Sequence, residues 1–268
     1  MARKKNSKRA TRAPGKSSRT DAAPPPAATR NARIPLVDAL RGAAIVMMLA
    51  YHFSFDLNYF GVLHQNFYQD AFWIAARSVI VGSFLALVGV SLALAADRGV
   101  RWPAYGRRLA VIAACAIVVS TGSYFMFPAS WIYFGVLHFI AVAGIVGLAF
   151  LRLRLANLLT GAVLIVVGAL FASPLFDQPW LNCVGLMTRK PVTEDYVPLL
   201  PWFGVVLVGL YIGQQLLQAR RLAPARGWHA TGTIGRALGW AGRHSLAIYM
   251  LHQPLLLGIL YLLLGHRR

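Results

Sequence analysis

Residues 34–60 read IPLVDALRGAAIVMMLAYHFSFDLNYF, an apolar stretch that nevertheless carries Asp38, Arg41, His52 and Asp56. These residues fall at helical spacings of three and four, because positions 38, 41, 45, 48, 52 and 56 lie on one face of a helix. At 1.5 Å per residue, Asp38 and Asp56 are about 27 Å apart, roughly one hydrocarbon thickness. The stretch therefore predicts a membrane-spanning helix with a polar stripe. Ionisable groups at membrane depth usually mark a functional site.

The composition of the whole chain agrees with a membrane protein. It has 268 residues, of which 57% are hydrophobic and 13% are charged, whereas about a quarter of the residues in a soluble domain are charged. The formal net charge is +19, which in a soluble protein would suggest nucleic-acid binding. Here Lys and Arg gather in the N-terminal tail and in alternate loops, the pattern of cytoplasmic segments in membrane proteins. We therefore expect a lipid bilayer around the chain and no nucleic-acid partner.

The first 33 residues differ from everything that follows. They hold ten Lys and Arg, many Ser, Pro and Ala, and no apolar periodicity. Such a composition predicts a disordered basic tail. No apolar segment that would form a signal peptide comes before residue 36, so the tail should stay cytoplasmic. We thus expect two regions, the tail at 1–33 and a transmembrane domain at 34–268.

Seven apolar segments follow the tail. Each is near the length that a spanning helix needs, although the fifth is short. They predict an all-α, polytopic membrane helix bundle of about seven transmembrane helices. The segments lie near residues 35–56, 71–96, 108–127, 132–151, 157–173, 197–217 and 244–265.

The loops between these segments predict the orientation. Lys and Arg are absent from loops 57–70 and 128–131 and few in loop 174–196, while the loops on the opposite side are rich in arginine. The positive-inside rule then places the N-terminus in the cytoplasm and the loops at 57–70, 128–131 and 174–196 outside. The outer side is also acidic and aromatic, and its aromatic residues either anchor the protein at the interface or stack on a sugar ring.

Several polar side chains in the apolar segments point to chemistry near the outer side. His52 and Asp56 have the spacing in which a carboxylate orients a histidine that acts as base or nucleophile. Arg77, His138 and His252 lie at outer-to-middle depth in other segments, where they can bind a substrate or stabilise an oxyanion. His64, in the first outer loop, is a second candidate base. Alternatively, each histidine makes only interhelical hydrogen bonds.

The inner end of the first helix has its own candidates. Asp38 and Arg41 are three residues apart, which suits a local ion pair. Equally, they suit a cytoplasmic mouth where Arg41 contacts the phosphate of a donor cofactor. No zinc-type spacing of Cys and His occurs in the sequence, and we predict no metal site.

A set of segments resembles one family as a group. RIPLVDALRGAAIVMMLAYHFSFDLNYFG, FLALVGVSLAL, YFGVLHFIAVAG, VPLLPWFGVVLVG and GRHSLAIYMLHQPLL occur in this order over residues 33–260. They resemble bacterial membrane proteins of the heparan-α-glucosaminide N-acetyltransferase catalytic-domain family. More loosely, the chain is similar to transmembrane acyltransferases whose first helix has an Arg-Gly pair and a histidine near its outer end.

The resemblance implies an acetyltransferase in the bacterial inner (plasma) membrane. Acetyl-CoA would bind from the cytoplasm as co-substrate, with Asp38 and Arg41 on the donor side. An amine or hydroxyl of a sugar or glycoconjugate would accept the acetyl group outside. His52 matches the first-helix histidine of the wider acyltransferases, and His64 lies closest to the loop histidine implicated in the family itself.

Two rival interpretations remain open. A transporter or flippase would use the same His/Asp/Arg stripe as an ion or proton path. A structural membrane protein would use the polar groups only to join helices. The sequence leaves open whether the chain forms a homo-oligomer.

Overall fold

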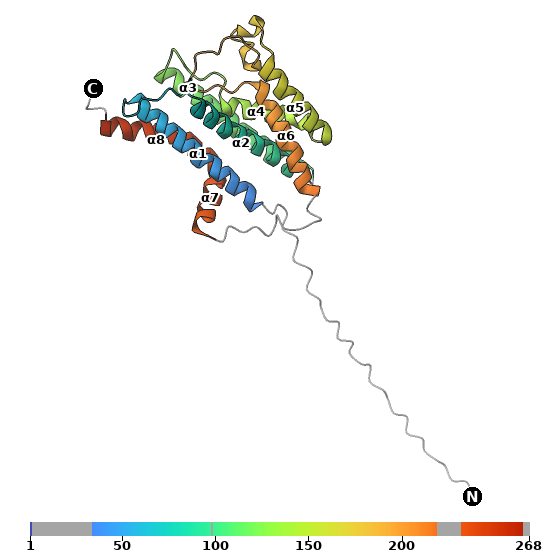
Figure 1. Cartoon of the computed structure of the whole chain (residues 1–268). Coiled ribbons are helices and arrows are strands. Elements are labelled where there is room, and N and C mark those ends of the chain that lie inside the picture. The colour runs from blue at the N-terminus through green and yellow to red at the C-terminus, as the bar shows by residue number, and fades with distance from the viewer. Residues whose placement is uncertain (2–33, 98, 219–231, 265–268) are drawn as a thin grey trace. The chain divides into compact units, whose positions relative to one another are not determined.

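The protein is a bundle of helices connected by loops, with no strand among the residues that the structure describes (Figure 1). The structure is a computed structural model and describes residues 1, 34–97, 99–218 and 232–264. The predicted basic tail falls almost entirely outside these residues. So do Arg220, Arg221 and Arg226, which lie between the sixth and seventh predicted segments.

The helices follow the predicted apolar segments closely. They are α1 (Pro35–Tyr59), α2 (Ala71–Ala96), α3 (Trp102–Met126), α4 (Val136–Gly147), α5 (Leu155–Leu170), α6 (Leu199–Gln218), α7 (Thr233–Arg243) and α8 (Ser245–Leu264), with short 3₁₀ turns η1 (Leu148–Phe150), η2 (Pro174–Asp177) and η3 (Asn182–Val184). The α7 helix was not predicted. It lies in a region that the sequence analysis assigned to a loop, because eleven residues with three glycines carry little helical signal.

Five helices are long and apolar enough to cross a membrane. These are α1, α2, α3, α6 and α8, while α4 with η1 and α5 are apolar but shorter. The bundle is thus a multi-pass membrane protein with lipid contact along its helices, and five of the seven predicted spans meet the length that spanning requires. Large apolar side chains on the outward faces of α3 and α8, among them Ile117 and Leu255, are exposed as lipid-facing residues should be.

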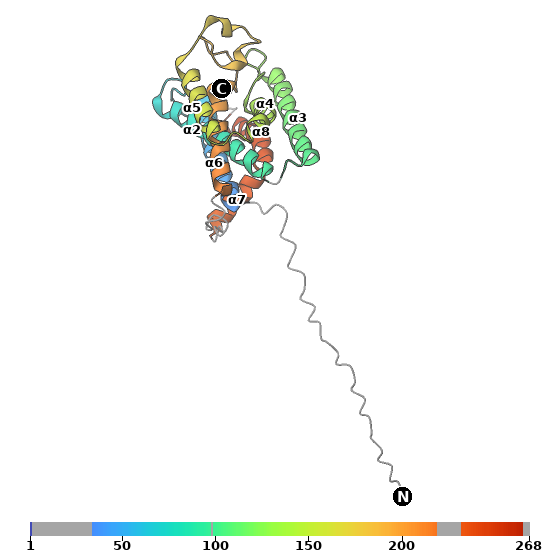
Figure 2. The same cartoon turned by 90° about the vertical axis from the view of Figure 1, so that its right-hand side faces the viewer.

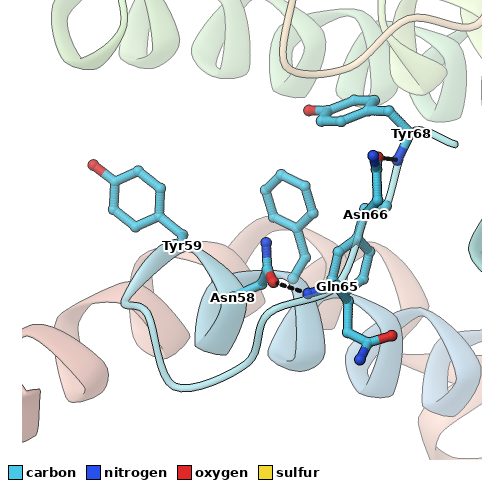
Figure 3. Close-up of a pocket in the computed structure, with 7 residues that line it drawn as sticks. Asn58, Tyr59, Gln65, Asn66 and Tyr68 are labelled. Atoms are coloured by element: carbon cyan, nitrogen blue, oxygen red, sulfur yellow. Dashed lines mark hydrogen bonds between the residues drawn. The ribbon is translucent and has the colours of Figure 1, made fainter. Parts of the chain in front are cut away.

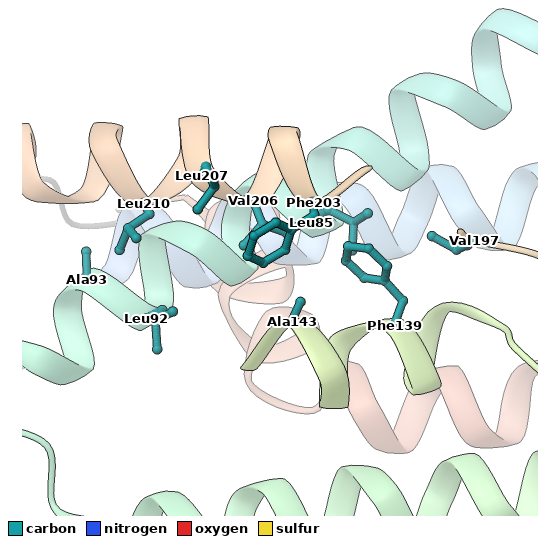
Figure 4. Close-up of a cluster of buried hydrophobic side chains, with 10 residues drawn as sticks. All are labelled: Leu85, Leu92, Ala93, Phe139, Ala143, Val197, Phe203, Val206, Leu207 and Leu210. Atoms are coloured by element: carbon teal, nitrogen blue, oxygen red, sulfur yellow. The ribbon is translucent and has the colours of Figure 1, made fainter. Parts of the chain in front are cut away.

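The main apolar core lies between α2, α4 and α6 (Figure 4). Leu85 and Leu92 of α2 pack with Phe139 of α4 and with Val206 and Leu207 of α6, and all are buried. In lipid, close packing of helix surfaces replaces the hydrophobic effect as the driving force for association. This core therefore holds three helices in fixed register beside the candidate site.

Glycines allow the helices of this core to touch at their backbones. A Cβ on Gly209 would overlap the α2 backbone at Ala86, and a Cβ on Gly89 would overlap the α6 backbone at Val206. Gly161 of α5 and Gly204 of α6 face each other in the same way. Such small-residue contacts are the common way for membrane helices to approach closely. Gly209 and Gly213, four residues apart on α6, both lie against α2 in this interface.

A second close crossing joins α1 to α7 at the opposite end of α1 from the outer loops (Figure 1). A Cβ on Gly42 would overlap the carbonyl of Leu238, and a Cβ on Gly242 would overlap the carbonyl of Asp38. The α7 helix leads into α8, which runs beside α1. The α1 and α8 helices thus present side chains to each other along a shared interface.

The three loops predicted to lie outside gather at one end of the bundle, toward the top of Figure 2. Glu194 N–H donates to the Ser130 carbonyl at 2.9 Å, and the Ser130 hydroxyl donates to the Glu194 carboxylate at 2.5 Å. Lys190 lies over the ring of Tyr68 at 5.8 Å from its centroid. The loops after α1, α3 and α5 therefore lie at the same end of the bundle, as the scarcity of Lys and Arg in them predicted.

Candidate functional site

The polar stripe of α1 faces the interior of the bundle. Asp56 and Ile45 are 1% exposed and Met48 is 4% exposed, whereas Val46 and Phe53, on the other faces, are exposed. Asp38, Arg41 and His52 are partly buried. The helical spacing thus predicted the correct inward face. The stripe divides into a polar end at 52–56, a polar end at 38–41 and an apolar middle.

Asp56 makes its hydrogen bond across the α1–α8 interface. Its Oδ1 accepts from Gln253 Nε2 at 2.8 Å. Within the described residues, Asp56 Oδ2 and Gln253 Oε1 have no hydrogen-bond partner although both atoms are buried. No hydrogen bond joins Asp56 to His52 in this part of the chain. The carboxylate therefore orients α8 directly, and any effect on His52 passes through the neighbouring α8 side chains.

His52 and His252 form a pair of rings between α1 and α8. Their centroids are 4.9 Å apart in an edge-to-face arrangement. His252 Nδ1 lies 2.5 Å from the carbonyl oxygen of Tyr249, and because a carbonyl only accepts, Nδ1 carries the proton. In neutral His252 the lone pair is then on Nε2, which is buried and has no partner among the described residues. This nitrogen is available as a base.

Tyr249 connects the histidine pair to the outer loops. Its ring lies 5.5 Å from that of His252, and its hydroxyl donates to Asp195 Oδ2 at 3.3 Å. The same carboxylate oxygen accepts from the Val136 N–H at 2.8 Å, at the start of α4. Burial raises the pKa of Asp195, and its two hydrogen bonds oppose that shift. Asp195 therefore binds α4 and α8 to the loop that ends at α6.

Arg77 lies on α2 near the same end of the bundle. Its guanidinium acts electrostatically on the hydroxyls of Tyr51 and Tyr68 and on the Lys190 ammonium. Tyr51 in turn contacts the His52 ring, with centroids 5.8 Å apart. Tyr51 thus contacts His52 through its ring and interacts electrostatically with Arg77 through its hydroxyl.

His138 lies in a different local environment. The Gly135 N–H donates to its Nδ1 at 3.3 Å, and its Nε2 is 3.1 Å from Ser120 Oγ. Because Nδ1 accepts, Nε2 carries the proton and donates to Ser120, whose hydroxyl donates to the Ile132 carbonyl at 2.6 Å. Both ring nitrogens are therefore used in holding α3 against the start of α4.

The loop after α1 forms a pocket of about 280 Å³ at the C-terminal end of that helix (Figure 3). Its walls combine aromatic rings with amide side chains, a mixture suited to stacking on a sugar ring and bonding its hydroxyls. The lining residues are Phe55, Asn58, Tyr59, Gln65, Asn66, Phe67 and Tyr68. His64 belongs to the same loop but is exposed and outside this lining.

At the other end of α1, Asp38 and Arg41 form an ion pair, with Nη1 and Oδ1 3.3 Å apart. Arg41 Nη2 also donates to Ser91 Oγ on α2 at 2.7 Å. The local pair that the spacing predicted is therefore present, together with an interhelical bond that was not predicted.

The sequence analysis missed three members of the cluster. Gln253, Tyr249 and Asp195 all contact predicted site residues or their neighbours. Gln253 was detectable as an amide directly after a histidine in an otherwise apolar helix. Asp195 had been counted only as a charge of the outer side. Among the described residues, no group of three or more His, Cys, Asp or Glu side chains could hold a metal ion.

The helices and the buried polar cluster define a multi-pass membrane protein with a site between α1 and α8. Residues 33–254 match the catalytic domain of heparan-alpha-glucosaminide N-acetyltransferase. The chain therefore belongs to that family, as the sequence motifs indicated. Searches among curated proteins and among solved structures gave no match. Family membership and the apolar helices together indicate a membrane acetyltransferase.

Proposed function

We propose that this protein moves an acetyl group from cytoplasmic acetyl-CoA to an amine or hydroxyl of a sugar or glycoconjugate on the outer side of a bacterial inner membrane. Its N-terminus would be cytoplasmic. The observation that carries the proposal is the His52–His252 pair beside the Asp56–Gln253 hydrogen bond. A buried, unpartnered imidazole nitrogen is costly unless a ligand or a proton uses it.

The histidine pair would work as a base on the acceptor. With an amine acceptor, the nitrogen attacks the thioester carbonyl carbon and a C–N bond forms. His252 Nε2 takes the proton that the amine loses, the C–S bond breaks, and the departing sulfur receives that proton, directly or through His52. The products are an amide and a free thiol, so atoms and charge balance. General-base catalysis of this kind contributes about 10²–10⁴-fold.

Asp56 and Gln253 would hold this pair in position. The Asp56 carboxylate fixes Gln253, the residue that follows His252 on α8. Loss of either side chain would let His252 move relative to His52, and misplacement of about 1 Å can cost 10²-fold in rate. This is the orienting role that the sequence suggested for Asp56, exerted here through α8.

The donor would bind at the Asp38–Arg41 end. Arg41 would contact a phosphate of acetyl-CoA, because a guanidinium pairs with phosphate through two N–H groups. Arg41 and His52 are eleven residues apart on α1, about 17 Å at 1.5 Å per residue. The extended pantetheine arm of the donor would have to cover that distance for the thioester to reach the histidines.

The acceptor would occupy the outer pocket. Its aromatic walls and its amides Asn58, Gln65 and Asn66 provide stacking surfaces and hydrogen-bonding groups for a sugar. Arg77 would position the acceptor from α2. His64, exposed in the same loop, is the alternative base, whereas the bonded nitrogens of His138 favour a positioning role.

The test is transfer from radiolabelled acetyl-CoA to a panel of amino sugars by the purified protein in lipid vesicles. We expect His52→Ala and His252→Ala to lower product formation by about 10²-fold or more. His244→Ala is the matched control. His244 Nδ1 also lies near a carbonyl of its own helix, that of Trp240 at 2.9 Å, but this residue is exposed at the start of α8.

Four outcomes would contradict the assignment. Full activity of both variants with unchanged thermal stability would remove the histidine pair from catalysis, and loss of activity only in His64→Ala would move the base to the loop. Absence of labelled sugar, combined with proton uptake that requires His52, would favour a transporter. A change in stability without any product or flux would favour a structural role.

A further inference from the structure

The α7 helix packs on the bundle with one face. A Cβ on Gly242 would overlap the Asp38 carbonyl, and the Leu238 carbonyl lies where a Cβ on Gly42 would be. Gly239 and Gly242 are the buried residues of this helix. Contact between two backbones at small residues is a close form of helix packing, so α7 is held tightly against the first turns of α1. Its other faces are left for a partner outside the bundle.

The outward face of α7 is both basic and apolar. Arg236, Trp240 and Arg243 are spaced by four and three residues, which places them on one side of the helix. All three are exposed, and Ile234 in the first turn is 78% exposed. Arginines combined with a tryptophan and an aliphatic side chain are typical of helices that lie in the interface of a membrane.

Two contacts orient these side chains. The Trp240 ring packs on the His244 ring, with centroids 4.7 Å apart, at the junction between α7 and α8. The Arg243 guanidinium lies back along the helix beside Gly239, since a Cβ there would be 3.4 Å from its Nη1. Gly239 is three residues from Arg236, so Arg243 is directed toward the turn that carries Arg236. The helix therefore presents two cations on the same side.

The chain supplies no counter-charge for these cations in the part that the structure describes, where neither arginine forms an ion pair. Asp38, whose backbone lies against Gly242, has its carboxylate paired with Arg41 at 3.3 Å. Unpaired cations beside an exposed indole fit a partner that is anionic at one end and apolar at the other. A phospholipid with a negatively charged headgroup has both properties.

The connection to α8 places α7 at the membrane boundary. The α7 helix ends at Arg243, and α8, which is long and apolar enough to cross a membrane, begins at Ser245. In Figure 2, α7 lies at the lower end of the bundle, opposite the loops at the top. The chain thus enters the lipid directly after α7, at the depth where tryptophan and basic residues meet the headgroups. The outward face of α7 is therefore beside the surrounding lipid.

We propose that α7 is an interfacial helix that binds anionic phospholipid. Arg236 and Arg243 bind the headgroup phosphate, because a guanidinium pairs with phosphate oxygens through two N–H groups. The Trp240 indole lies at the boundary between headgroups and acyl chains. Because α7 is packed against the α1 backbone, bound lipid stabilises the end of α1 that carries Asp38. This proposal does not depend on the proposed function.

The first test is a lipid titration of the full chain in a maltoside detergent. The thermal stability is followed as dioctanoyl phosphatidylglycerol is added, with dioctanoyl phosphatidylcholine as the neutral lipid and inorganic phosphate as the free anion. The double variant Arg236→Gln/Arg243→Gln removes both cations of α7. Its matched control is Arg107→Gln/Arg108→Gln, which removes two exposed arginines near the start of α3.

We expect phosphatidylglycerol to stabilise the wild type with saturation, and phosphatidylcholine and phosphate to have no such effect. The half-saturating concentration should rise by at least about tenfold in the α7 double variant, since each basic residue near an anionic lipid surface has about a fivefold effect on affinity. The α3 double variant should stay close to the wild type. Equal weakening in the two double variants would show a general charge effect and overturn the proposal.

The second test measures depth in vesicles of phosphatidylglycerol and phosphatidylcholine. A nitroxide label is attached at Ala237→Cys, an exposed position of α7, after Cys115 and Cys183 are replaced by serine. The reference label is at Val192→Cys, in the exposed loop between α5 and α6. We expect the α7 label to relax more with oxygen and less with a water-soluble nickel chelate than the reference label. This arm keeps both arginines, so it tests the placement even if the double variant fails to fold.

The remaining outcomes are equally decisive. Equal stabilisation by phosphatidylcholine would remove the role of the lipid charge, and equal stabilisation by inorganic phosphate would assign the site to a free anion. An α7 label as accessible to the nickel chelate as the loop label would place the helix in water. Each of these results would overturn the proposal.

Discussion

The bond between Asp56 and Gln253 gives a quantitative test of the α1–α8 interface. Gln253→Leu keeps most of the side-chain volume but leaves Asp56, 1% exposed, without the donor that lies 2.8 Å from its Oδ1. Hydrogen bonds to charged groups contribute about 1.5–3 kcal/mol in soluble proteins. Interhelical hydrogen bonds in a membrane protein average about 0.6 kcal/mol, with a maximum near 1.7 kcal/mol. Because Asp56 is fully buried, we expect a coupling energy near that maximum, about 1.5 kcal/mol.

The assay is a double-mutant cycle. Unfolding of wild type, Gln253→Leu, Asp56→Leu and the double variant would be followed by circular dichroism in mixed micelles of maltoside and dodecyl sulfate. Leu251→Ala is the control, since Leu251 is an exposed neighbour on α8. We expect Gln253→Leu alone to cost about 2–3 kcal/mol, which includes the desolvation of an unpaired carboxylate. A coupling energy below about 0.5 kcal/mol, within the usual error of additivity, would refute the reasoning.

Three further predictions concern packing, polar bonding and pH. Asp195→Ala should lower the free energy of unfolding by about 1–3 kcal/mol, because it leaves the Val136 N–H and the Tyr249 hydroxyl without their acceptor. Asp195→Asn keeps an acceptor oxygen and should lower the free energy of unfolding by less than half as much in the same assay. Gly242→Ala should lower the free energy of unfolding by about 1–3 kcal/mol, because the added Cβ would overlap the α1 backbone. Its control is Gly258→Ala, where the added Cβ meets open space, and this variant should change the free energy of unfolding by no more than about 1 kcal/mol. Hydrogen bonds from Thr188 hold the pKa of Asp177 below its ordinary value of 3.8. The stabilisation by these bonds is therefore complete above pH 3.8 and is lost as the pH falls through the lower pKa of the folded protein. The hydrogen-exchange protection of the Thr188 N–H should hold from pH 7 to about 4 and fall only below it.

The sequence was most informative where a local rule decided the structure. Helix spacing identified the inward face of α1, because a 3.6-residue period maps directly onto one side of a helix. The α2 helix begins and ends at the predicted residues 71 and 96, since an uninterrupted apolar run between polar loops leaves little choice. The shared lack of basic residues correctly grouped the three loops that meet at one end.

The sequence was least informative about contacts between helices. Gln253 bonds Asp56 from 197 positions away in the chain, and no spacing rule connects two helices. The contact of Lys190 with the ring of Tyr68 was not predicted, because it depends on how the loop between α5 and α6 folds back. The α7 helix was missed for a similar reason, since glycine lowers the local helix propensity, and the close approach of Gly242 to α1 cannot be read from the local sequence.

The apolar middle of the stripe separates the enzyme and transporter interpretations. Ile45 and Met48 are almost fully buried and pack with Ile80 of α2, so the polar ends of α1 at 38–41 and 52–56 are not joined by polar side chains on that helix. An ion following this face would have to cross an apolar segment without hydration, which is costly in a membrane. An acetyltransferase has no such requirement, because the acetyl thioester is uncharged and only the donor's phosphates must remain at the Arg41 end. The arrangement therefore favours group transfer between two separate polar regions over conduction along one path.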